Sequence, residues 1–162
     1  MNFKGIQISK TYNQINNAPP EVVFPLLCPV REKEWIDGWD YEMIYSKSGL
    51  IEKGCTFSTP HHGNEQTIWY VTEYDKVNYR IEFVRFSPNE EIARINIILL
   101  NNGDGTTTSS ITYQYTALND LKKDWIQDKL ENEFIESMIW WEKSINHYLE
   151  KGEKLMRQIS TK

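Results

Sequence analysis

The architecture of this chain follows from residues 119–150, which read NDLKKDWIQDKLENEFIESMIWWEKSINHYLE. Large apolar side chains recur there every three or four positions, a spacing that places them on one side of a helix with 3.6 residues per turn. We therefore predict one uninterrupted amphipathic helix that begins at Asn119 or Asp120 and is roughly 45 Å long, at about 1.5 Å per residue. Its apolar stripe consists of Leu130, Phe134, Met138, Trp141, Ile145 and Leu149.

Such a helix needs a broad partner, because its apolar stripe is not stable in water. Residues 41–118 supply one, since apolar and polar residues alternate there as they do in half-buried strands. Short turns such as Asn102-Gly103-Asp104-Gly105 join neighbouring segments, so these strands must be antiparallel. The six predicted strands are 41–46, 54–59, 67–74, 78–86, 91–101 and 106–118.

A strand and two short helices precede this meander. Residues 4–14 alternate between polar and apolar side chains and are predicted to form a seventh strand, which ends before residues 16–18. Pro19-Pro20-Glu21 is typical of a helix start. Pro25 should kink or shorten that helix, and a second short helix is predicted over 30–36.

Length and composition favour one domain that spans residues 1–162. The formal net charge of −5 argues against nucleic-acid binding, which depends on basic patches. Cys28 and Cys55 have no metal-binding or redox spacing. Residues 1–10 lack the apolar region of a signal peptide, and no apolar run approaches the length of a membrane span. We therefore expect a soluble, cytoplasmic protein with no stable membrane insertion.

The order of elements, together with four local segments, resembles the START-like superfamily, also called SRPBCC. Its members include pollen-allergen-like proteins, aromatic polyketide cyclases and lipid-transfer domains. The segments that carry the resemblance are 20–24 (PEVVF), 34–39 (EWIDGW), 54–57 (GCTF) and 69–75 (WYVTEYD).

The resemblance implies an α+β helix-grip fold, in which a curved seven-stranded antiparallel sheet wraps around the long carboxy-terminal helix. It also implies an apolar cavity between sheet and helix, where many relatives bind small hydrophobic or amphipathic molecules. The superfamily shares no universal catalytic triad, metal site or cofactor, so the resemblance assigns none of these.

Strand alternation and the helical stripe select the side chains that would face such a cavity. For any single position ordinary core packing is the favoured explanation, so the cavity is predicted from the set of these residues taken together. The predicted ligand-binding residues are Trp69, Phe83, Ile97, Tyr113, Tyr115, Phe134, Met138 and Trp141.

The leading functional prediction is binding of a small hydrophobic or amphipathic molecule in this cavity. One alternative is an enzyme of the polyketide cyclase, aromatase or dehydratase type, in which Tyr113 or Tyr115 assists proton transfer. A second alternative is a co-chaperone or interaction module, which an exposed Trp39 or Trp140 would support. No G-x-S-x-G or H-E-x-x-H motif occurs, so no catalytic residue is assigned.

Two groups of polar residues are expected to lie on the surface. His61 and His62 should diverge on a solvent-exposed loop, without a nearby carboxylate to complete a metal site, so no metal is predicted. Arg94 alternates with the inward residues of its strand, as Glu82 does on the neighbouring strand. We expect cross-strand ion pairs on the solvent side, unless the register is reversed and these charges face the cavity.

Overall fold

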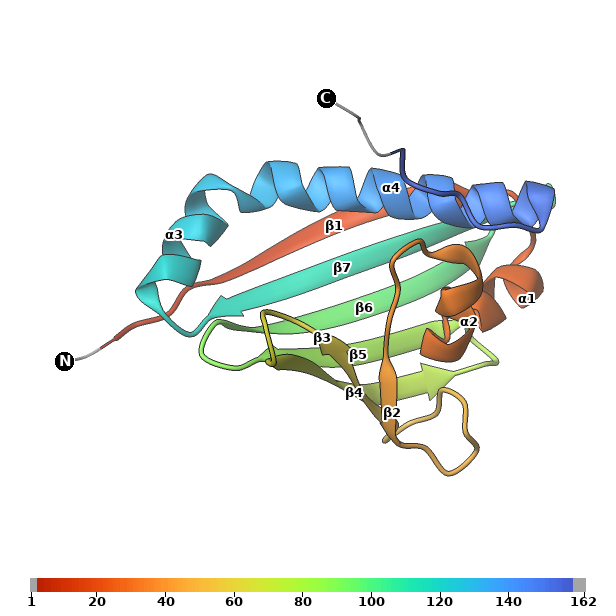
Figure 1. The fold of residues 1–162 in the computed structure, drawn as a ribbon. Helices are drawn as coiled ribbons and strands as arrows, with labels where there is room; N and C mark the ends of the chain where they lie inside the picture. The colour runs from red at the N-terminus through yellow and green to blue at the C-terminus, as the bar shows by residue number, and fades with distance from the viewer. Residues whose placement is uncertain (1–2, 159–162) are drawn as a thin grey trace.

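Seven strands form one antiparallel sheet in a computed structural model that describes residues 3–158 (Figure 1). Their order is β1-β7-β6-β5-β4-β3-β2, so the first strand pairs with the last and the other six follow one another as predicted. The strands are β1 (Gln7–Asn16), β2 (Glu42–Tyr45), β3 (Thr56–Pro60), β4 (Gln66–Asp75), β5 (Arg80–Ser87), β6 (Glu91–Asn101) and β7 (Thr107–Ala117).

Helices cover one face and one end of this sheet. The long helix α4 runs beside β1 and β7, while the short helices α1 and α2 lie near its carboxyl end (Figure 1). The predicted effect of Pro25 is confirmed, because α1 gives way to a 3-10 helix there. The helical segments are α1 (Pro20–Val23), η1 (Phe24–Leu27), α2 (Pro29–Trp35), α3 (Asp120–Asp128) and α4 (Leu130–Lys151).

The prediction of one uninterrupted carboxy-terminal helix is wrong. The chain bends at Lys129, between α3 and α4, and α3 turns toward the end of the sheet (Figure 1). The bend allows α3 to pack against β7. Ile126, Leu130 and Phe134 are all buried and keep a spacing of four residues across the bend, so the apolar pattern does not reveal it.

The first strand also differs from its prediction, since β1 extends to Asn16 instead of ending near Gln14. Both residues are fully buried. The Gln14 amide donates a hydrogen bond to Asn16 Oδ1 at 3.1 Å, and Ser109 Oγ donates to the same oxygen at 2.6 Å. These hydrogen bonds satisfy the buried Asn16 Oδ1 and one donor of Gln14, whereas Gln14 Oε1 has no partner among the described residues.

Trp35 anchors α2 in the core. Its side chain is fully buried, and its indole N–H donates to the Leu26 carbonyl oxygen at 2.9 Å. The Trp35 ring meets the Trp141 ring of α4 edge-on, with 5.1 Å between centroids. An aromatic pair of this geometry stabilises the contact beyond the area it buries, so Trp35 holds α2 against α4.

The register of the sheet places the expected charges on its outer face. Arg94 Nε donates to Glu82 Oε2 across the β5–β6 pair at 2.9 Å, which confirms the predicted cross-strand ion pair. Phe83 and Ile95 are also partners in this pair and are buried on the opposite face. The reversed register is therefore excluded.

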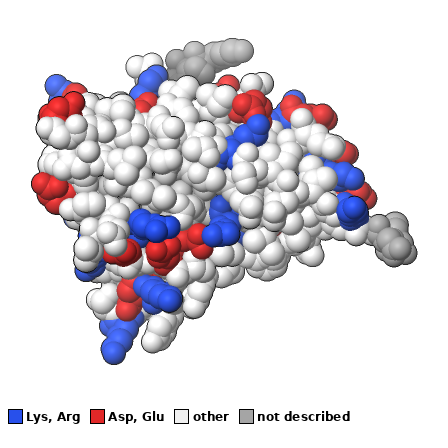
Figure 2. Space-filling view, turned by 180° about the vertical axis from the view of Figure 1, so that it is seen from behind, with Lys and Arg blue, Asp and Glu red and all other residues white. Residues whose placement is uncertain are grey.

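Charged side chains of both signs are interspersed on the side of the molecule that Figure 2 shows. Basic groups lie beside acidic groups there. Between residues 3 and 158, no helix has both the length and the apolar character that crossing a membrane requires.

Candidate ligand-binding cavity

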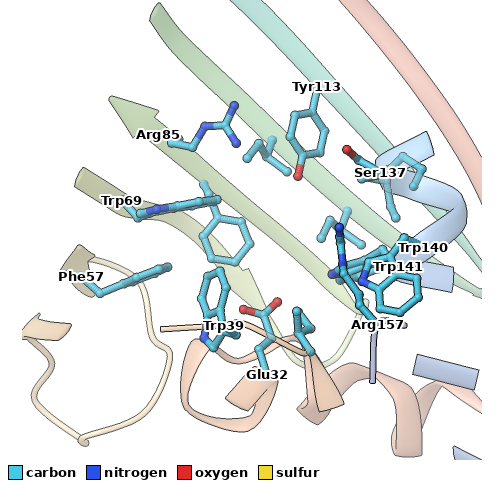
Figure 3. Close-up of a pocket in the computed structure, with 16 residues that line it drawn as sticks. Glu32, Trp39, Phe57, Trp69, Arg85, Tyr113, Ser137, Trp140, Trp141 and Arg157 are labelled. Carbon is cyan, nitrogen blue, oxygen red and sulfur yellow. The ribbon is translucent and has the colours of Figure 1, made fainter. Parts of the chain in front are cut away.

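A cavity of about 290 Å³ lies between the inner face of the sheet, α2 and α4 (Figure 3). Five strands, β3 to β7, contribute side chains to its wall, and α4 closes the opposite side. The aliphatic part of the wall consists of Ile36, Ile95, Ile97, Ile111 and Met138. The cavity exists because a curved sheet and one helix leave space that these side chains do not fill.

The structure brings together six of the eight predicted ligand-binding residues on this wall, namely Trp69, Phe83, Ile97, Tyr113, Met138 and Trp141. Tyr115 and Phe134 instead line a smaller neighbouring pocket of about 190 Å³. Tyr113 and Met138 border both spaces. The role of all eight residues in ligand binding stays a prediction.

Aromatic rings form the end of the cavity near β3 and β4. Phe57 and Trp69 stack at 5.4 Å between centroids with only 11° between their planes, and the Trp39 ring meets both edge-on. The indole N–H of Trp69 donates to Thr59 Oγ1 at 3.0 Å, and that of Trp39 donates to the Pro29 carbonyl oxygen at 2.8 Å. Because both indole donors are satisfied by protein groups, this end of the cavity offers apolar ring surface.

Arg85 is an inward-facing charge that the analysis of the sequence missed. Its Nη2 donates to Glu91 Oε1 at 2.9 Å, and its guanidinium carbon lies 5.4 Å from the centroid of the Trp69 ring and 5.7 Å from that of Tyr113. Its Nε is buried and has no hydrogen-bond partner among the described residues. The alternation of Ile81 and Phe83 continues to Arg85, so the strand pattern contained a signal for it.

Glu32 is the second polar group that the sequence analysis missed. It lies on α2, and its carboxyl group points into the cavity (Figure 3). Burial raises the pKa of this carboxyl group to about 8, so it is protonated at neutral pH. Its spacing of four residues from Ile36, which also lines the cavity, could have identified it.

Tyr113 and Tyr115, the two tyrosines considered for proton transfer, have pKa values farther from neutrality than that of Glu32. Burial raises the pKa of Tyr113, although the nearby Arg85 guanidinium opposes the change. Burial also raises the pKa of Tyr115. Both phenols therefore remain protonated at neutral pH and are suited to donating hydrogen bonds, while Glu32 titrates closer to neutrality.

The carboxy-terminal segment lies over one opening of the cavity. Helix α4 ends at Gly152, which adopts a left-handed φ of 70°. The chain then returns toward α2, where the Arg157 backbone N–H donates to Asp37 Oδ2 at 3.0 Å. The Arg157 guanidinium lies over the Trp140 ring, 4.7 Å from its centroid. Arg157 and Trp140 therefore form the cavity wall at this opening (Figure 3).

Trp39 and Trp140, the two tryptophans considered for a protein-interaction surface, are not fully exposed. Trp39 and Trp140 are both half-buried, and both line the cavity. A partner-binding surface built on either ring is therefore less favoured than a role in the cavity wall.

The expectation that His61 and His62 diverge is wrong. Their ring centroids are 4.0 Å apart, and their Nε2 atoms lie 2.8 and 3.5 Å from Glu90 Oε1. Glu90 belongs to the turn between β5 and β6, which lies beside the turn that carries the histidines. The carboxylate that the local sequence does not supply thus comes from another hairpin. The two histidine nitrogens and the Glu90 oxygen, which are atoms able to bind a metal ion, lie within 4.8 Å of one another. The His61–Glu90 contact links the two turns.

Comparisons with known proteins identify the fold. No protein-family model and no curated protein matches the sequence. An uncharacterized protein from Rhizobium leguminosarum has a similar structure, with a TM-score of 0.67 at 12% identity over 91% of this chain and 97% of that one. The aromatase/cyclase Zhui from Streptomyces sp. R1128 has a TM-score of 0.63 at 9% identity, over 94% and 100% of the two chains.

A third similar structure is norcoclaurine synthase from Thalictrum flavum in complex with dopamine and hydroxybenzaldehyde. Its TM-score is 0.64 at 8% identity, over 92% of this chain and 90% of that one. These similarities confirm the predicted helix-grip fold and the predicted resemblance to START-like proteins in fold.

Proposed function

We propose that this protein binds a small apolar or amphipathic molecule in the cavity between the sheet and α4. The observation that carries the proposal is a space of about 290 Å³ inside a folded domain, walled by aromatic and aliphatic side chains. Protein interiors are close-packed, so a mainly apolar space of this size that opens to the surface is suited to a small ligand. The cavity is at the small end of the range for ligand pockets, roughly 300–1,000 Å³, which favours a compact ligand.

The shape of the aromatic wall favours a flat ligand. Phe57 and Trp69 stack on each other, and the Arg85 guanidinium lies over the Trp69 ring (Figure 3). A planar aromatic molecule would therefore meet these two rings at their edges, and edge-to-face contact is a favourable geometry for aromatic pairs. The similar structure that holds dopamine and hydroxybenzaldehyde supports the idea that this fold accommodates single aromatic rings.

Filling the cavity should abolish binding. We expect Ile97→Phe to weaken the binding of 2-naphthamide, a flat uncharged probe, by at least about tenfold, because Ile97 is 5% exposed and its side chain lines the cavity. Ile98→Phe is the matched control, since Ile98 follows on the same strand and points to the other face of the sheet. Isothermal titration calorimetry on wild type and both variants checks this prediction. Equal affinity in Ile97→Phe and wild type would place the binding site elsewhere.

A second candidate function is acid–base catalysis on the bound molecule, and the carboxyl group of Glu32 favours it. A group with a pKa of about 8 is close to the ideal for proton transfer near neutral pH. The Tyr113 hydroxyl also points into the cavity and could donate a hydrogen bond to a substrate oxygen (Figure 3). A rate profile with an inflection near pH 8 that disappears in Glu32→Gln would identify Glu32 as the acid–base group.

A further inference from the structure

The side chains that line the cavity carry more positive than negative charge at neutral pH. The residues that line the cavity include one glutamate, Glu32, and two arginines, Arg85 and Arg157. The two guanidinium groups are permanently charged, whereas the Glu32 carboxyl group is protonated because burial raises its pKa to about 8. Among the described residues that line this cavity, the side chains charged at neutral pH are therefore the two arginines.

Arg85 retains unused hydrogen-bonding capacity although its charge is partly compensated. Its partner Glu91 does not line the cavity, and the second carboxylate oxygen of Glu91 lies 3.3 Å from Lys122 Nζ. One carboxylate is thus shared between two cations. The Arg85 guanidinium has five N–H donors, of which one is paired with Glu91 and the buried Nε has no acceptor among the described residues.

A ligand in the cavity can reach the exposed part of the guanidinium, since the Arg85 side chain is 20% exposed and pairs with Glu91 through Nη2 alone. Guanidinium groups bind carboxylates with particular strength, because their planar array of donors matches two carboxylate oxygens. The Arg85 guanidinium projects toward the cavity beside Tyr113 and Trp69 (Figure 3). An anionic group at this position would lie beside the aromatic side chains of the cavity wall.

We propose that the molecule bound in this cavity is an aromatic or similarly flat acid, whose carboxylate accepts hydrogen bonds from Arg85. This inference rests on the proposed ligand-binding function and specifies the chemical class of the ligand. A cationic ligand is disfavoured by the same geometry, since it would meet the like charges of Arg85 and Arg157 on the cavity wall.

The test compares two probes that differ in charge and hardly in shape, 2-naphthoate and 2-naphthamide, by isothermal titration calorimetry at pH 7. We expect wild type to bind 2-naphthoate about tenfold more tightly than 2-naphthamide, because the carboxylate adds a negative charge and a second acceptor oxygen opposite the guanidinium. In Arg85→Gln this preference should disappear, because the variant lacks the charge that distinguishes the two probes. Glu91 keeps Lys122 as a partner in this variant.

Arg94→Gln is the matched control, because Arg94 forms a similar ion pair with Glu82 on the outer face of the sheet. It should retain the preference for 2-naphthoate. If Arg85→Gln does not fold, as judged by circular dichroism, Arg85→Lys provides the second variant. Lysine keeps the charge and loses the planar donors, so part of the preference should remain.

The outcomes separate this inference from the proposed function. If wild type binds both probes equally, or if Arg85→Gln keeps the preference, the proposal that the ligand is an acid bound by Arg85 is wrong. The cavity would still bind flat apolar molecules. If wild type binds neither probe, binding of flat aromatic molecules in this cavity is itself contradicted.

Discussion

Replacement of Trp35 by alanine is expected to lower the free energy of unfolding by about 3–5 kcal/mol, the usual cost of removing a large buried aromatic side chain. Trp35 is fully buried, and its ring packs edge-on against Trp141 of α4. The substitution also leaves the Leu26 carbonyl oxygen without the indole donor 2.9 Å away. Chemical denaturation monitored by circular dichroism measures the change, and the melting temperature should fall by roughly 10 °C.

Trp35→Phe serves as the control for this experiment. It keeps most of the ring volume but loses the indole N–H, so its cost should be about 1–3 kcal/mol. A loss below about 1 kcal/mol in Trp35→Ala would show that α2 is not anchored through this residue, and the position of Glu32 on the cavity wall would then be wrong.

The second large effect concerns Glu32 and pH. The pKa of this carboxyl group rises from its ordinary value of 4.5 to about 8 on folding, because burial disfavours the charged form. Folded protein therefore holds the proton more tightly than unfolded protein does. The stability that Glu32 contributes is fully present below pH 4.5 and is lost as the pH rises toward 8.

Glu32→Gln removes this dependence, because glutamine has no proton to lose. Relative to wild type, the variant should gain stability between pH 5 and pH 9, by a total on the order of 2–4 kcal/mol. Urea denaturation of both proteins across this range measures the difference, and all other ionisable groups are common to the two chains. A difference that does not change with pH would mean that the Glu32 carboxyl group is exposed to water.

The elements that the sequence predicted well are those whose side chains obey one period throughout. Five strands with period two, β3 to β7, and a helix with period 3.6 bury the expected faces, from Phe83 and Ile97 on the sheet to Phe134 and Met138 on α4. Local turn chemistry then made neighbouring strands antiparallel. These features depend on the burial of apolar side chains, which a linear pattern records directly.

The bend at Lys129 was hidden because it leaves the apolar period intact. Ile126 and Leu130 are buried on either side of the bend with the spacing of a continuous helix. Packing of α3 on the end of β7 sets the bend, and this contact joins the helix to a preceding strand. The convergence of His61 and Glu90 also depends on a contact between distant segments, because two separate turns must lie side by side before these side chains meet.

Glu32 and Arg85 were missed for a different reason. Both occupy positions whose spacing indicates an inward face. Charged side chains are rarely buried, however, so apolar residues are the ones that a sequence pattern assigns to a cavity wall. Charged residues face a cavity when burial shifts the pKa, as for Glu32, or when an ion pair compensates the charge, as for Arg85 and Glu91. Such compensation comes from tertiary contacts, so a single sequence pattern does not record it.

Native mass spectrometry of the protein purified from its own host, beside Ile97→Phe prepared in the same way, shows whether the cavity holds a ligand. If it does, wild-type protein carries a non-covalent adduct of a few hundred daltons, roughly what a pocket of this size holds, and the variant carries none. An adduct of the same mass on both proteins would contradict ligand binding in this cavity, as would bare protein in wild type together with no binding of 2-naphthamide.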